Sequence, residues 1–136
     1  MYEWFDAYCM AKPGVTRDFK AEWNWYRYFV GGKFFAAAGQ NGEGEIVFLS
    51  LRGEPDFNQF LRRNYQAVAP GYYSNKELWN TVWFSLEQIP ERDRDPDAPP
   101  VFPPDDLVRE MTDRSYEIML GKLTKKQRAE ILEQNK

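Results

Sequence analysis

The residues best suited to binding a ligand lie in one segment where aromatic rings, amides and a lysine alternate. This segment, Pro70–Val82, reads PGYYSNKELWNTV. Aromatic faces can stack on nucleic-acid bases, and a lysine can contact a phosphate. The candidate contacts are Tyr72, Tyr73, Asn75, Lys76, Trp79 and Asn80. The alternative is a structural cap of the hydrophobic core, in which Asn75 caps a short helical turn and Trp79 is buried.

Basic residues on predicted strands and at one helix end form the second candidate group. Arg27, Lys33 and Arg52 would give a positively charged rim if their strand faces agree, and winged hairpins use such residues to contact phosphates. Exposed cations on strands also guard a sheet edge against unwanted pairing, which is the alternative interpretation. Lys12 follows the first predicted helix, where a cation also interacts favourably with the helix dipole.

Catalytic chemistry has few candidates in this sequence. The chain has no histidine, which excludes serine–histidine triads, HExxH zinc sites and zinc fingers. Its one cysteine, Cys9, lies on the apolar face of the first predicted helix, which predicts a buried structural thiol. The motif GxxxxGK[ST] is absent, and neither a helix nor a lysine follows Gly39–Gly44 to bind a triphosphate. We therefore expect a non-enzymatic protein without a metal or a cofactor.

The charges of the chain are unevenly distributed. Its 136 residues carry a net charge of -3, and Glu91–Asp106 alone holds six acids, two bases and five of the nine prolines. Proline combined with dense charge is a loop composition, so we expect an acidic surface loop over residues 91–104. The rest of the chain has a net charge of +1. A chain of this length is sufficient for one core, so we expect a single domain over residues 1–136.

The hydropathy of the chain argues against a membrane protein. No apolar run approaches the roughly 18 residues that suggest a transmembrane helix, and the mean hydropathy is -0.71. The N-terminal segment MYEWFDAYCM lacks the basic and apolar regions of a secretory signal. We therefore expect a cytoplasmic protein with no membrane partner.

The elements that must position these residues begin with a helix and an antiparallel meander. The expected elements of this half are a helix over 2–10 and three strands over 23–30, 33–38 and 45–51. The Gly-Gly pair at 31–32 between the first two strands is typical of a two-residue hairpin turn. Such a turn would place Phe29 opposite Phe34. Tyr28 would then face Phe35.

The second half is predicted to add two helices, a strand and a helical tail. These elements are a helix over 55–65, a strand over 80–86, a helix over 107–121 and a tail helix over 124–134. The buried face of the first helix is predicted to carry Phe57, Phe60, Leu61 and Asn64. Arg62 and Arg63 are turned away from it, and Thr124 and Gln127 have the spacing of a capping box. The order α, βββ, α, β, α predicts an α+β fold with an antiparallel sheet covered by helices.

Four blocks of the sequence follow a recognisable pattern. They are Ala11–Thr16, Val30–Ala36, Pro70–Val82 and Ser115–Glu117 with Lys122-Leu123. In this order they resemble the MmcQ/YjbR family of small bacterial proteins, and the resemblance runs from about Cys9 to Lys126. It implies an α+β fold similar to frataxin and CyaY, discussed as a "double wing" arrangement and often labelled DNA-binding.

The chain departs from this family pattern in two places. Tyr73 and Leu78 stand where the family's turn often has histidine, so no imidazole is available there. The acidic stretch 91–104 looks like an insertion before the last long helix. Near the wings it would repel a phosphate backbone.

We therefore predict a binding module whose partner is DNA. The predicted phosphate contacts are Arg27, Lys33 and Lys76, and the predicted stacking residues are Tyr73 and Trp79. The alternative is a small-ligand or protein-interaction module whose pocket is the Tyr72–Asn80 turn. Aromatic walls with a few polar groups suit small molecules better than a polyanion.

Overall fold

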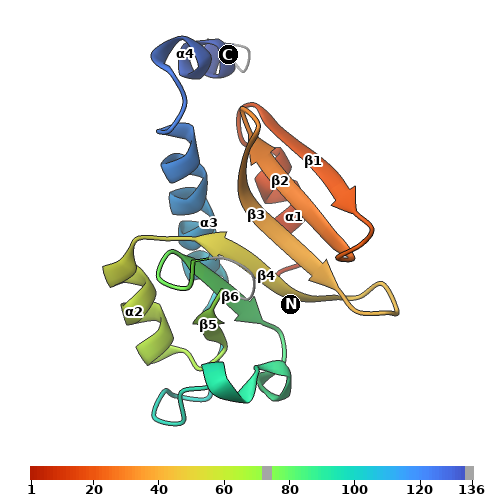
Figure 1. Ribbon diagram of the computed structural model, residues 1–136, viewed down its shortest axis with the longest axis vertical. Coiled ribbons are helices and arrows are strands. Elements are labelled where there is room, and N and C mark those ends of the chain that lie inside the picture. The colour runs from red at the N-terminus through yellow and green to blue at the C-terminus, as the bar shows by residue number, and fades with distance from the viewer. Residues whose placement is uncertain (72–74, 134–136) are drawn as a thin grey trace.

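The computed structural model describes residues 1–71 and 75–133, and its centre is a six-stranded antiparallel sheet with strand order β1-β2-β3-β4-β6-β5 (Figure 1). The strands are β1 (Val15–Lys20), β2 (Trp25–Val30), β3 (Lys33–Gln40), β4 (Ile46–Arg52), β5 (Val68–Pro70) and β6 (Trp79–Trp83). The helices are α1 (Phe5–Met10), α2 (Pro55–Asn64), α3 (Asp105–Leu120) and α4 (Lys125–Glu133), with short 3-10 turns η1 (Leu86–Gln88) and η2 (Glu91–Asp93).

This arrangement confirms the predicted α+β class with an antiparallel sheet and covering helices, but the outer strands β1 and β5 were not predicted. Four of the six residues of β1 are exposed, so its sequence lacks the apolar alternation of a half-buried strand. β5 has three residues and ends at a proline. Outer strands pair on one side alone, which tolerates both features. The predicted strand over 80–86 was too long, because β6 ends at Trp83.

The hairpin between β2 and β3 has the predicted two-residue turn. Gly31 and Gly32 have φ values of 55° and 79°, in the left-handed region that favours glycine. Phe29 pairs with Phe34, as predicted. Tyr28 pairs with Ala36 instead of Phe35, because a bulge adds one residue to β3 at this point.

One face of the sheet packs against α1 and α3 and forms the core (Figure 1). Its buried side chains include Phe5, Cys9, Tyr28, Phe35, Leu49, Val82, Val108 and Met111. The Ser115 hydroxyl of α3 lies between two strands, where it donates to Phe35 O at 2.5 Å and accepts from Arg52 N at 2.9 Å. The long helix is therefore bonded directly to the backbones of β3 and β4.

The predicted orientation of α2 was wrong for three residues, and one of them is Asn64, which was expected on the buried face but is exposed. Phe60 is 53% exposed, and Arg62 points inward to donate to the Asn80 side chain at 2.8 Å. Leu61 is buried as expected, and so is Asn58, which had been given no role. The neighbouring end of β6 offers polar groups that need partners, and this requirement overrides the apolar pattern of the helix.

The tail helix α4 has the predicted capping box. Gln127 N donates to Thr124 Oγ1 at 3.1 Å, and Thr124 N donates to Gln127 Oε1 at 3.0 Å. The turn before α4 touches the β2–β3 hairpin, since a Cβ at Gly31 would lie 2.6 Å from Leu123 Cδ1. Neither α4 nor any other described helix has the length and apolar character needed to cross a bilayer.

The acidic segment over 91–104 begins with η2 and runs beside β5. The backbone N–H of Gln66 donates to Pro99 O at 2.9 Å, and Ala98 is buried. Figure 1 places the loop that contains η2 at the end of the molecule opposite α4. The densest negative charge therefore lies far from the β2–β3 hairpin tip.

Candidate functional site

The described part of the predicted aromatic turn makes structural contacts. Trp79 is 7% exposed and its ring stacks on Phe34, with centroids 5.1 Å apart. The Asn75 side chain accepts from the Glu77 backbone N–H at 3.0 Å, as a turn cap does. These contacts fit the structural alternative, while Tyr72 and Tyr73 lie outside the described residues.

Asn80, the last residue of this candidate set, is part of a buried hydrogen-bond network. Its amide donates to Asn58 Oδ1 at 2.7 Å, and its oxygen accepts from Arg62 Nε at 2.8 Å. Asn58 also donates to the backbone oxygens of Gly53 at 3.1 Å and Glu77 at 2.8 Å. Burial lowers the pKa of Arg62, which needs these partners to keep its charge inside the protein. Little hydrogen-bonding capacity is left in this network for a ligand.

Three of the candidate binding cations already have carboxylate partners. Lys12 Nζ lies 2.5 Å from Asp113 Oδ1, and Arg27 binds both carboxylate oxygens of Asp18 at 2.8 and 2.6 Å. Lys76 Nζ lies 3.2 Å from Asp93 Oδ1. A phosphate would have to compete with a carboxylate at each of these positions.

The positively charged rim predicted from Arg27, Lys33 and Arg52 does not form. Lys33 pairs with Val30 across the hairpin and shares its face of the sheet. Arg27 is three residues from Val30 in β2 and therefore lies on the opposite face. Arg52 is partly buried, and its Nε has no hydrogen-bond partner among the described residues.

The structure instead brings Lys33 to one end of the molecule with lysines near the start of α4. We call Lys33, Lys122, Lys125 and Lys126 the hairpin–α4 end. All four are exposed, and none has an ion-pair partner within residues 1–71 and 75–133. The contact between Gly31 and Leu123 holds the two segments together.

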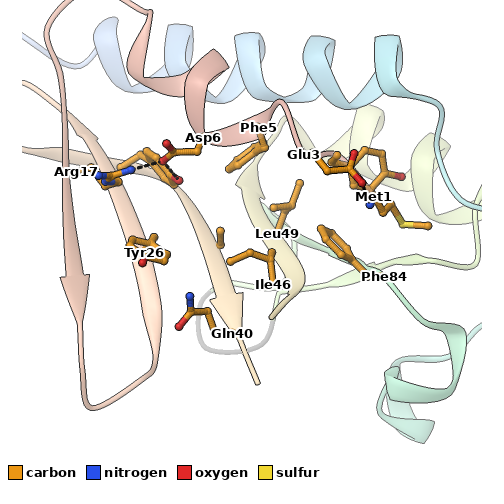
Figure 2. Close-up of a pocket in the computed structure, with 13 residues that line it drawn as sticks. Met1, Glu3, Phe5, Asp6, Arg17, Tyr26, Gln40, Ile46, Leu49 and Phe84 are labelled. Atoms are coloured by element: carbon orange, nitrogen blue, oxygen red, sulfur yellow. Dashed lines mark hydrogen bonds and ion pairs between the residues drawn. The ribbon is translucent and has the colours of Figure 1, made fainter. Parts of the chain in front are cut away.

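A cavity of about 470 Å³ lies between α1 and the sheet, and we call it the α1 cavity (Figure 2). Its apolar wall is made by Phe5, Ile46, Leu49 and Phe84. Its polar wall is made by Asp6, Arg17, Tyr26 and Gln40. These residues come from α1, from strands β1 to β4 and from the segment after β6.

Hydrogen bonds fix the geometry at one end of the polar wall. Asp6 Oδ1 accepts from Arg17 Nη1 at 2.6 Å and from the Tyr28 hydroxyl at 2.7 Å. Burial acts to raise the pKa of Asp6, but the hydrogen bonds from Arg17 and Tyr28 lower it below the ordinary value. Burial, with the hydrogen bond to Asp6, raises the pKa of Tyr28, so its hydroxyl stays a donor.

Sequence reasoning missed the α1 cavity because its walls depend on a strand that was not predicted. Arg17 belongs to β1, and its side of the cavity exists only because β1 pairs with β2. One available signal was the short turn at 21–24 between two segments of strand length, which is typical of a hairpin. The pairing of Asp6 with Arg17 carries no local sequence signal.

Comparison with known proteins places this fold in a family. The YjbR family model matches residues 10–118. The YjbR proteins of Escherichia coli K12 and O157:H7 are each 32% identical over 76 residues, which cover 56% of this chain and 63% of theirs. The match thus spans less than two thirds of the curated relatives.

Two solved structures share the fold. Deinococcus radiodurans protein DR2400, with a DUF419 domain, has a TM-score of 0.71 and 24% identity over 93% of this chain and 84% of its own. A Pseudomonas syringae protein has a TM-score of 0.60 and 19% identity over 88% of this chain and 98% of its own. The family-model match covers most of the chain, and the chain therefore belongs to the YjbR family.

Proposed function

We propose that this protein is a non-enzymatic binding module that takes a small molecule in the α1 cavity. The observation that carries this proposal is a volume of about 470 Å³ with an apolar wall on one side and a few polar groups on the other. Ligand sites typically have volumes of about 300–1,000 Å³ and this mixed composition. This proposal places the small ligand in the α1 cavity, whereas the sequence pattern placed it at the Tyr72–Asn80 turn.

The state of the candidate nucleophiles supports binding without catalysis. Burial raises the pKa of Cys9, the only thiol, so it is not a thiolate at neutral pH. Burial and a hydrogen bond to Asp113 raise the pKa of Tyr8 to about 12. Within the described residues, no group of three acidic or cysteine side chains is placed to hold a metal ion.

A fragment screen by two-dimensional NMR of the full chain tests this proposal. We expect hits to shift the amide signals of Asp6, Tyr26 and Ile46 around the α1 cavity. Ala38 also lines the cavity, so Ala38→Leu would fill part of it and weaken the hits. The matched control is Ala129→Leu on the exposed surface of α4. Equal binding by Ala38→Leu, or shifts confined to another region, would contradict the proposal.

The hairpin–α4 end supports a second candidate function, DNA binding. Four exposed lysines without ion-pair partners in the described chain can neutralise phosphates, and the acidic loop lies at the other end of the molecule (Figure 1). The net charge of -3 limits this function to that end. Of the phosphate contacts predicted from the sequence, Lys33 alone belongs to the hairpin–α4 end.

Fluorescence anisotropy with labelled single- and double-stranded DNA tests the second candidate. We expect the affinity to fall with rising salt and to drop several-fold in the double variant Lys33→Glu with Lys125→Glu. Arg27→Gln is the matched control, because Arg27 is already paired with Asp18. Absence of binding at low salt, or an equal loss in the control, would exclude this surface.

A further inference from the structure

The chemistry of the polar wall narrows the ligand class, if the α1 cavity is the binding site proposed above. We infer that the cavity takes an uncharged ring compound with an amide-type edge, meaning a hydrogen-bond donor beside an acceptor. Lactams and pyrimidine-like rings belong to this class. Three features of the lining carry the inference: its charge balance, the free amide of Gln40 and the apolar wall that contains two phenylalanine rings.

The charges of the lining are already balanced. Arg17 and Asp6 neutralise each other through a contact of 2.6 Å. The other lining carboxylate, Glu3, is 83% exposed and pairs with the amino group of Met1. A charged ligand would lose hydration on entering, and a pair whose two charges already neutralise each other offers it no net attraction in return. The lining therefore favours a ligand with no net charge.

The hydrogen-bonding capacity of the lining is not balanced. No described residue is hydrogen-bonded to the Gln40 side chain, which offers both a donor NH2 and an acceptor oxygen. Figure 2 shows Gln40 and the Asp6–Arg17 pair at opposite ends of the polar wall, with Tyr26 between them. A ligand edge with one donor and one acceptor matches the Gln40 amide without adding charge.

The opposite wall determines the shape of the ligand body. Phe5, Ile46, Leu49 and Phe84 form the apolar wall, across the cavity from Tyr26 (Figure 2). Aromatic rings pack well in offset or edge-to-face contact with other rings. A planar ring between this wall and the polar wall buries apolar surface while keeping its polar edge toward Gln40.

Four matched probes test the inference: benzamide, benzoate, benzylammonium and toluene. They share one ring and differ in a neutral amide, a negative charge, a positive charge and no polar group. In NMR titrations of the full chain we expect benzamide to bind at least about five-fold more tightly than each other probe. Gln40→Leu should weaken benzamide about ten-fold and leave toluene unchanged. The matched control is Gln59→Leu, on the exposed side of α2.

A second variant keeps the test independent of stability. Gln40→Glu adds a negative charge at the same position, so it should weaken benzamide and strengthen benzylammonium. Benzoate or benzylammonium binding the unaltered chain as tightly as benzamide would overturn the ligand class while the cavity proposal stands. Toluene binding as tightly as benzamide would do the same. If none of the four probes shifts a signal around the cavity, the proposed function itself fails.

Discussion

Two clusters centred on arginine use similar groups in opposite ways. Arg17 donates to Asp6 at the edge of the α1 cavity, and its side chain is 40% exposed. Arg62 donates to Asn80 and to the backbone oxygens of Lys76 and Trp79, where burial lowers its pKa. The hydrogen bonds of Arg62 hold buried parts of the fold together. The hydrogen bond of Arg17 has a similar length, but its groups line a cavity, where a ligand can reach them.

The largest effect is expected from breaking the buried cluster at Asn58. Asn58→Ala leaves two backbone oxygens and the Asn80 amide without their partner, which should lower the free energy of unfolding by about 3 kcal/mol. Urea denaturation measures this loss. The control Gln59→Ala, one residue along α2 and exposed, should change stability by less than about 0.5 kcal/mol. A loss as small as that of the control would show that the network is not structural.

A smaller loss is expected at Arg62 itself. Arg62→Met keeps much of the apolar stem but removes three hydrogen bonds from a charged donor, which should cost about 2 kcal/mol. Arg63→Met changes the next residue, which faces solvent, and should be close to neutral. Thermal and urea unfolding of the two variants compare them directly. If Arg62→Met and Arg63→Met were equally stable, the hydrogen bonds of Arg62 would not be important for the stability of the fold.

The cavity cluster should contribute less to stability than the buried cluster, and its contribution should depend on pH. Because the folded pKa of Asp6 is lowered, its stabilising contribution is present above the ordinary aspartate pKa of about 3.9 and is lost as pH falls through the folded value. Asp6→Asn should therefore cost less than about 1 kcal/mol at neutral pH, since the pair is half exposed. The difference from the unaltered chain should vanish under strongly acidic conditions. If the stability difference between Asp6→Asn and the unaltered chain grew as the pH fell, the Asp6 carboxylate would not be stabilising the fold.

The smallest stability effect is expected at Gln40. Its side chain has no hydrogen bond to another described residue, so Gln40→Leu should leave the free energy of unfolding within about 0.5 kcal/mol. Urea denaturation checks this value. A loss comparable to that of Arg62→Met would mean that the cavity cluster supports the fold as the buried cluster does.

The sequence was sufficient to predict features that depend on local chemistry. The Gly31-Gly32 turn, the capping box at Thr124, the buried Cys9 and the α+β class are all confirmed. Each depends on residues close together in the chain or on an apolar pattern. The single domain, the cytoplasmic location and the binding partner stay predictions.

Features that depend on distant pairing could not be predicted in the same way. The inward turn of Arg62 requires Asn80 on β6, and the neutralised charge of Lys12 requires Asp113 on α3. The opposite faces of Arg27 and Lys33 follow from the register of the hairpin. No composition or spacing rule carries this information, because each contact joins elements that only the complete sheet brings together.

The Ser115 hydroxyl between β3 and β4 has a consequence for the order of events during synthesis. It bridges Phe35 O and Arg52 N, which lie on neighbouring strands. The link between these two backbone groups therefore needs a side chain that lies 63 positions after Arg52 in the chain. While residue 115 is still inside the ribosome, Phe35 O and Arg52 N lack the Ser115 hydroxyl that links them. The Arg52 amide therefore gains protection from solvent exchange only when α3 docks, and it reports that docking step during folding.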